Sequence, residues 1–146
     1  MSRAPTAAEL REAAIAMAEE AGAILLEGYG RVHTPEKKGR IDLVTVYDRR
    51  SEELILRRIA ERFPGSGVLA EESGTHEFAG GAALRWIVDP LDGTTNYAHN
   101  YPFFSVSIAA ELEGELVAGA VHDPVAHETF AAALGAGATL NGSPIH

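Results

Sequence analysis

Acidic residues follow three short apolar runs in this chain of 146 residues. The runs and the acids that close them are Val44–Val46 before Asp48, Val68–Ala70 before Glu71, and Trp86–Val88 before Asp89. Such runs are typical of β-strands, and strand ends at one edge of a sheet lie close together even when they are far apart in sequence. Asp92 follows Asp89 by three residues, with Pro90 stiffening the turn between them. We therefore expect four carboxylates to converge on one edge of a sheet.

Converging carboxylates repel one another unless a cation neutralises them. Hard divalent cations such as Mg²⁺ bind oxygen ligands of this kind. The next segment, Asp92-Gly93-Thr94-Thr95-Asn96, contains a glycine that permits close backbone approach. If a turn or helix starts there, the Gly93 and Thr94 amides would point outward as an anion site. Together these features predict a phosphate-ester site in which Thr94 orients or deprotonates a water and Asp48 accepts the proton.

Structural roles compete with this interpretation. An Asp-Gly-Thr segment by itself is usually a turn, and an acid before a helix is usually a cap. Two other phosphate or metal motifs do not fit. An EF-hand needs ligands where Leu91 and Gly93 stand. The haloacid-dehalogenase type of phosphatase has Asp-x-Asp, one residue shorter than the spacing of Asp89 and Asp92.

Two helices are predicted before the sheet. Thr6 and Glu9 match a capping box, and Gly28 and Gly30 are expected to end the helix that it begins. Residues 31–40 are polar and basic and predict a loop or a hairpin arm, and residues 42–48 predict a strand. A second helix is expected after that strand. Its buried side is predicted to carry Leu54, Ile55, Ile59 and Phe63.

The second half of the chain has the pattern of a mostly antiparallel sheet. Strands are predicted over residues 68–70, 86–88, 103–110, 116–121 and 129–133, with an exposed linker over roughly residues 73–84. Asn141-Gly142 predicts a two-residue hairpin turn. The predicted fold class is therefore α+β: a layered sandwich with two N-terminal helices packed on a mostly antiparallel sheet.

Composition restricts the function. Twelve basic and 21 acidic residues give a formal net charge of −9, which disfavours nucleic acids and anionic membrane surfaces as partners. The chain has no cysteine, which excludes disulfides, zinc–thiolate sites, iron–sulfur clusters and thiol nucleophiles. No apolar run approaches the roughly 20 residues of a spanning helix. A cytoplasmic location is the expectation.

The segment from Trp86 to Asn96 strongly resembles the signature of the inositol monophosphatase family. Two upstream segments, residues 42–48 and 70–73, resemble that family's earlier motifs in the same order, and residues 140–145 resemble the segment that closes its first domain. The resemblance runs from about residue 6 to residue 146. It implies a Mg²⁺-dependent, Li⁺-sensitive phosphomonoesterase with stacked α and β layers that is usually a homodimer at full length.

The resemblance also implies roles for individual residues. Glu71, Asp89 and the Leu91 carbonyl would bind a first metal ion, and Asp89 and Asp92 would contribute to a second. Thr94, paired with Asp48, would activate the attacking water, with Glu71 also part of the catalytic set. The implied substrate contacts are Glu71, Leu91, Asp92, Gly93 and Thr94. Lys37 is placed near the site, and Glu72 is placed behind the metal ligands.

Members of the family are considerably longer than 146 residues. The expectation is that residues 1–146 are the N-terminal metal- and phosphate-binding domain, without the C-terminal domain and its metal-ligand aspartate. The resemblance implies myo-inositol 1-phosphate as the leading substrate. Within the family, Thr95 and Asn96 favour this branch over the nucleotide-phosphate branch. Histidinol phosphate and fructose 1,6-bisphosphate stay open as substrates. The alternative of a different class is a truncated, catalytically inert domain that binds metal.

Overall fold

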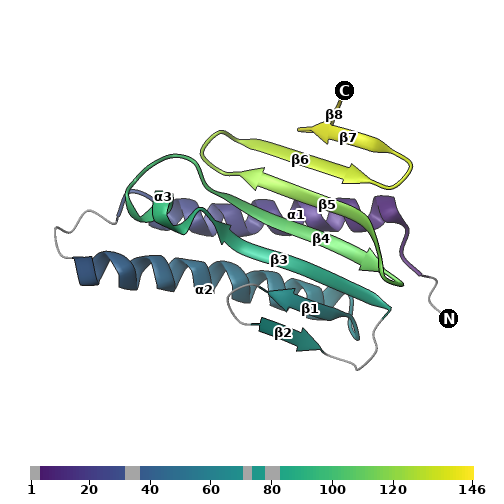
Figure 1. The fold of residues 1–146 in the computed structure, drawn as a ribbon, viewed down its shortest axis with the longest axis horizontal. Helices are drawn as coiled ribbons and strands as arrows, with labels where there is room; N and C mark the ends of the chain where they lie inside the picture. Colours follow the sequence, from purple (N-terminus) through teal and green to yellow (C-terminus); the bar gives the residue numbers. More distant parts are fainter. Residues whose placement is uncertain (1–3, 32–36, 71–73, 78–82) are drawn as a thin grey trace.

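The computed structural model describes residues 4–31, 37–70, 74–77 and 83–146. Two long helices, α1 (Ala7–Gly28) and α2 (Lys37–Arg62), pack against each other and cover one face of a single sheet (Figure 1). A short helix, α3 (Thr94–Ala98), follows the third strand. The strands are β1 (Gly67–Ala70), β2 (Gly74–Glu77), β3 (Leu84–Asp92), β4 (Ser105–Leu112), β5 (Glu115–Asp123), β6 (Glu128–Ala133), β7 (Gly137–Leu140) and β8 (Ser143–Ile145).

The eight strands form one sheet in the order β2-β1-β3-β4-β5-β6-β7-β8. All neighbouring pairs are antiparallel except β1 and β3, which are parallel. The architecture is the predicted one, with two N-terminal helices on a mostly antiparallel sheet. No helix in the described part of the chain has the length and apolar character needed to cross a membrane.

Helix α1 begins and ends where the sequence predicts. The Thr6 hydroxyl accepts the Glu9 N–H at 3.1 Å, and the Glu9 carboxylate accepts the Thr6 N–H at 3.2 Å, so the capping box is complete. This satisfies two of the N–H groups that a helix start leaves without intrahelical partners. The helix ends at Gly28. Its buried stripe consists of Leu10, Ala13, Ala14, Met17, Ala18, Ala21, Gly22 and Leu25.

The predicted strand over residues 42–48 is wrong, because these residues lie within α2. The same helix takes in residues 37–40, which were expected in a loop or a hairpin arm. The β-branched residues of the segment favour a strand only weakly, and tertiary packing overrides such a preference. Tyr47, Ser51 and Ile55 are all buried at four-residue spacing, so one helical stripe continues from the predicted second helix back through this segment. Leu54, Ile55 and Ile59 are buried as predicted, whereas Phe63 follows the end of α2 and is only half-buried.

Two further sequence predictions concern the edges of the sheet. The linker expected over residues 73–84 contains β2, which pairs antiparallel with β1, so that prediction is wrong for Gly74–Glu77. The hairpin turn at Asn141-Gly142 is confirmed, because it joins β7 to β8 with Leu140 opposite Ser143. Both turn residues have positive φ angles, 51° and 85°, as a two-residue hairpin of this type requires.

The core lies between the helices and one face of the sheet. Trp86 and Val88 of β3, together with Val106 and Ile108 of β4, point into it and are almost fully buried. Residues between them point to the other face, which neither α1 nor α2 covers (Figure 1). We call this second face the open face of the sheet.

Candidate active site

The parallel pairing of β1 and β3 brings their carboxyl ends to the same edge of the sheet. Ala70, the last residue of β1, pairs with Val88, the residue before Asp89. Because parallel neighbours end at the same edge, the residues that follow Ala70 and Val88 in sequence start from the same edge of the sheet, as predicted for the carboxylates. Glu71 and Glu72, which follow β1 in sequence, lie outside the described residues.

Asp89 was expected to follow the strand that ends at Val88. It instead lies inside β3, because that strand continues to Asp92. In a regular strand, residues three apart point to opposite faces. Here Asp89 pairs with Ser107 and Asp92 pairs with Ser105, so Pro90 and Leu91 both lie opposite one residue of β4. This is a β-bulge, and it turns the two carboxylates to the same face.

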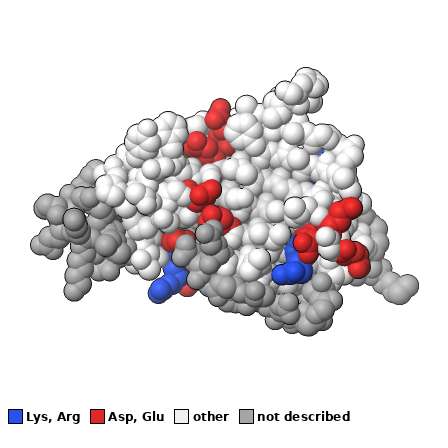
Figure 2. Space-filling model, in the orientation of Figure 1, with Lys and Arg blue, Asp and Glu red and all other residues white. Residues whose placement is uncertain are grey.

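That shared face is the open face. Asp89 lines a hollow of about 340 Å³ together with Leu69 and Ile87, which are outward-facing residues of β1 and β3. Asp92 is exposed and lines a neighbouring hollow of about 290 Å³ that also contains Asp123, the last residue of β5. Figure 2 shows acidic side chains gathered on this face, over the region where β3 and β5 end. The carboxylate-rich edge therefore includes an acid that the sequence analysis did not select.

A helix starts directly after Asp92, as the phosphate-site interpretation requires. Gly93 is the N-cap of α3, with a φ of 97°, and Thr94 is the first helical residue. A Cβ atom at position 93 would lie 3.0 Å from the carbonyl oxygen of Phe103. The left-handed backbone and this close approach both require glycine here. Gly93 is thus fixed close to the backbone of Phe103, and its approach to a phosphate group stays a prediction.

Asp48 approaches this region from a helix instead of a strand end. It lies on α2 and is 7% exposed, and α2 packs against both β3 and α3. Two neighbours that the sequence analysis did not select, Ser51 and Glu52, are also buried on this part of α2. Their helical spacing with Ile55 was the signal that could have located them. The side chain of Lys37 lies outside the described part of the structure.

Asp89 and Asp92 supply carboxylate oxygens on one face of the bulged segment that also carries the Leu91 carbonyl. This all-oxygen donor set fits a hard divalent cation and does not suit a soft metal. Among the described residues no group of three or more acidic, histidine or cysteine side chains is close enough to hold a metal ion. The described residues, 4–31, 37–70, 74–77 and 83–146, therefore supply only part of the ligands of a metal site.

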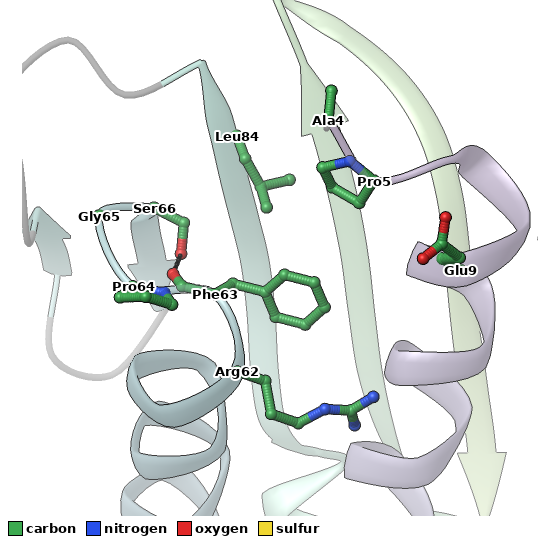
Figure 3. A pocket seen from close by; sticks show the side chains of 9 residues that line it. All are labelled: Ala4, Pro5, Glu9, Arg62, Phe63, Pro64, Gly65, Ser66 and Leu84. Carbon is green, nitrogen blue, oxygen red and sulfur yellow. Dashed lines mark hydrogen bonds between the residues drawn. The ribbon is translucent and has the colours of Figure 1, made fainter. Parts of the chain in front are cut away.

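A hollow of about 640 Å³ lies at the opposite end of β3 (Figure 3). Leu84, the first residue of β3, lines it together with residues from the start of α1 and the end of α2. Its charged side chains are Arg62, whose guanidinium lies 5.7 Å from the centre of the Phe63 ring, and Glu9 of the capping box. None of the residues predicted to do chemistry lines this hollow, so its volume does not mark the candidate site.

Comparison with known proteins agrees with the motif at Asp89–Asn96. The model of the inositol monophosphatase family matches residues 6–146. The chain belongs to the inositol monophosphatase family. It is 40% identical to "Inositol monophosphatase 3" of Solanum lycopersicum, over 92% of this chain and 51% of that protein. It is also 40% identical to "Histidinol-phosphatase" of Chlorobaculum parvum, over 90% of this chain and 51% of that protein.

Solved structures of the family share the fold. The extragenic suppressor protein suhB from Bartonella henselae superposes with a TM-score of 0.83 at 36% identity, covering 94% of this chain and 53% of the suhB chain. The inositol monophosphatase from Anabaena superposes with a TM-score of 0.78 at 40% identity, covering 93% of this chain and 48% of that one. The chain thus spans about half the length of the relatives and structures that it matches.

Proposed function

We propose that this chain supplies the metal- and phosphate-binding half of a Mg²⁺-dependent phosphatase that hydrolyses a small phosphate monoester. The observation that carries the proposal is the β3 bulge, which turns Asp89 and Asp92 to one face immediately before the start of α3 at Thr94. Carboxylates beside the backbone amides at a helix start suit a phosphate ester whose charge a cation shares. Membership of the family supports the same reaction class.

The residues of the candidate site have the following proposed roles in this reaction. Asp89, Asp92 and the Leu91 carbonyl would hold the cation, and Glu71 would complete that set and the catalytic set. When bound, Mg²⁺ would neutralise phosphoryl oxygens and make a water more acidic. The Gly93 and Thr94 amides would hold the phosphate. The Thr94 hydroxyl would orient the attacking water, and Asp48 would accept a proton from that hydroxyl.

Myo-inositol 1-phosphate is the proposed substrate. Proteins named as inositol monophosphatases are among the relatives at about 40% identity. Histidinol phosphate is the second candidate, because a relative named as a histidinol-phosphatase is equally similar over nearly the same residues. Fructose 1,6-bisphosphate is a third candidate within the same reaction class. We further propose a homodimeric full-length enzyme that is sensitive to Li⁺.

Magnesium binding and phosphate release test the proposal together. Isothermal titration with Mg²⁺ should detect binding to the chain, and the Asp89→Asn and Asp92→Asn variants should lose it, because each removes a charged ligand. Glu53→Gln is the matched control, since Glu53 is an exposed acid of α2 and its loss removes the same charge. Phosphate release from the three esters, measured with and without Mg²⁺ on the full gene product, then ranks the substrates.

Two results would contradict the proposal. Mg²⁺ binding that survives both aspartate substitutions would place the cation elsewhere. Mg²⁺ binding that is lost as expected, without phosphate release from any of the esters, would favour a metal-binding domain that is catalytically inert.

A further inference from the structure

Ser51 is a buried polar residue of α2 whose hydroxyl contacts the bulge of β3. Its exposed fraction is 0%, and its Oγ donates a hydrogen bond of 2.8 Å to the Pro90 carbonyl. A helical serine can satisfy its hydroxyl on the carbonyl four residues earlier in its own helix. Ser51 instead bonds a strand residue that is 39 positions away in sequence. The hydrogen bond therefore fixes the helix and the bulged segment relative to each other.

The acceptor of this bond belongs to the peptide unit that also contacts Asp89. The Pro90 carbonyl and the Leu91 N–H are the two ends of one planar peptide group, and in the trans form they point in opposite directions. The Leu91 N–H donates to Oδ1 of Asp89 at 3.3 Å. When Ser51 holds the carbonyl end of this group, the N–H end is held toward the carboxylate.

The regular β3–β4 pairing is interrupted at this peptide group. Pro90 and Leu91 lie together opposite Val106, so the register of the β3–β4 ladder is interrupted between Asp89 and Asp92. Pro90 also has no N–H to donate. The Ser51 hydroxyl supplies a hydrogen bond from α2 to this irregular segment between the two aspartates.

We propose that Ser51 positions the Asp89 carboxylate for cation binding by fixing the Pro90–Leu91 peptide group. The assignment of Asp89 to the cation rests on the proposed function, whereas the effect on the peptide group does not. Ser51 touches neither the cation nor the substrate, so it is a positioning residue. Groups that orient metal ligands in this way typically change metal affinity by 10- to 100-fold when they are removed.

The test compares Ser51→Ala with Ser66→Ala. Ser66 is a matched control: it is 3% exposed, and its Oγ donates to the Phe63 carbonyl at 2.7 Å, just beyond the far end of α2. Both variants lose one buried serine hydrogen bond to a backbone carbonyl, so both should destabilise the fold to a similar extent. If the role of Ser51 were purely structural, the two variants would also behave alike in the local measurements at Leu91 and Asp89 and in Mg²⁺ affinity.

The first readout needs no metal. Amide hydrogen exchange at Leu91 and the ¹³Cγ chemical shift of Asp89 are measured in the metal-free chain. Ser51→Ala should accelerate Leu91 exchange severalfold and move the Asp89 resonance, and Ser66→Ala should leave both as they are in the parent chain. Unchanged Leu91 exchange in Ser51→Ala would overturn the inference. If the alanine variant does not fold, Ser51→Cys replaces it, because a thiol is only a weak donor.

The second readout is the Mg²⁺ dissociation constant from calorimetry. Ser51→Ala should weaken binding by about tenfold or more, and Ser66→Ala should leave it within about twofold of the parent value. Equal weakening by both variants would overturn the positioning role. A parent chain that binds no Mg²⁺, but whose Leu91 exchange responds to Ser51→Ala alone, would contradict the proposed function and support the effect of Ser51 on the peptide group.

Discussion

Three polar side chains link α1 to the sheet near the end of β5. The Thr129 hydroxyl donates to the Glu19 carboxylate at 2.7 Å, and Nδ1 of His122 lies 2.8 Å from the same hydroxyl oxygen. A hydroxyl has one hydrogen, and a carboxylate can only accept. The hydrogen between His122 and Thr129 must therefore come from Nδ1, which fixes the tautomer of the neutral imidazole.

Burial lowers the pKa of His122 below its usual value, although the nearby Glu19 and Asp123 carboxylates act in the opposite direction. Well above pH 6.5 the imidazole is neutral in both the folded and the unfolded chain, so it adds no pH dependence there. As the pH falls below 6.5, the unfolded chain binds the proton first. The free energy of unfolding should therefore decrease until the pH reaches the pKa of the folded state, and then level off.

Urea unfolding of the parent and of His122→Gln between pH 5 and pH 7.5 measures this effect. The parent should lose stability over this range more steeply than the variant, because the variant lacks the group that titrates. His99→Gln serves as a control at an exposed histidine. Identical slopes for the parent and His122→Gln would contradict the prediction, and ¹⁵N spectra of the imidazole test the Nδ1–H tautomer independently.

At the scale of elements, Gly28 allows α1 to pack closely against two other helices. A Cβ atom there would overlap the Tyr47 ring of α2 and the Tyr97 hydroxyl of α3. The Tyr97 hydroxyl donates to the Leu25 carbonyl at 2.7 Å, and burial raises the pKa of Tyr97, so the hydroxyl stays protonated and cannot move away without losing this bond. Gly28 thus ends the helix, as predicted, and also permits the contact between the three helices.

Helix propensity and packing predict opposite effects for Gly28→Ala. Propensity alone would stabilise the chain by about 1 kcal/mol. Overpacking typically costs about 1–3 kcal/mol. The added Cβ overlaps both Tyr47 and Tyr97, so we expect a cost at the upper end of that range and a net loss in the free energy of unfolding measured in urea. Ala23→Gly, at an exposed position of α1, measures the propensity effect alone. A more stable Gly28→Ala variant would show that the two tyrosines can move apart.

Elements with local signals could be predicted from the sequence. The capping box at Thr6 and the turn at Asn141-Gly142 depend on residues a few positions apart, and both are confirmed. The start of α2 could not be predicted in this way. Residues 44–46 have the composition of a strand, and the polar residues Asp48 and Ser51 interrupt the apolar pattern of the helix, although both are buried.

In the candidate site, too, features with local sequence signals could be predicted, whereas tertiary contacts could not. The Asp89–Asn96 motif identified the acids and the helix start at Thr94, which the structure contains. The spacing of Asp89 and Asp92 predicts opposite faces in a regular strand. They share a face only because β4 pairs across the bulge, and the register of a partner strand cannot be inferred from the motif itself. Helical spacing could have placed Ser51 on the buried side of α2, but its hydrogen bond to Pro90 depends on a tertiary contact that the sequence does not reveal.

At the scale of the whole molecule, the helices of the described residues cover one side of the sheet only (Figure 1). The open face exposes large apolar side chains from β1, β3, β5 and β6. They include Leu69, Ile87, Val121 and Phe130, each between 36% and 41% exposed. A hollow of about 320 Å³ with mostly apolar walls crosses β4 to β8 on this face. Contiguous apolar surface of this kind is a site of association. The net charge of −9 opposes contact between two copies but is screened at physiological salt.

We therefore expect the 146-residue chain to self-associate through its open face. Phe130→Glu should reduce association, because it places a charge at the centre of the apolar surface. Leu134→Glu is the control: it adds the same charge at an apolar residue that is 62% exposed in the turn between β6 and β7. In sedimentation velocity, the average sedimentation coefficient should rise with concentration for the parent and for Leu134→Glu, and much less for Phe130→Glu. A parent chain that stays monomeric at every concentration would show that association does not occur through this face. An equal reduction of association in both variants would show the same.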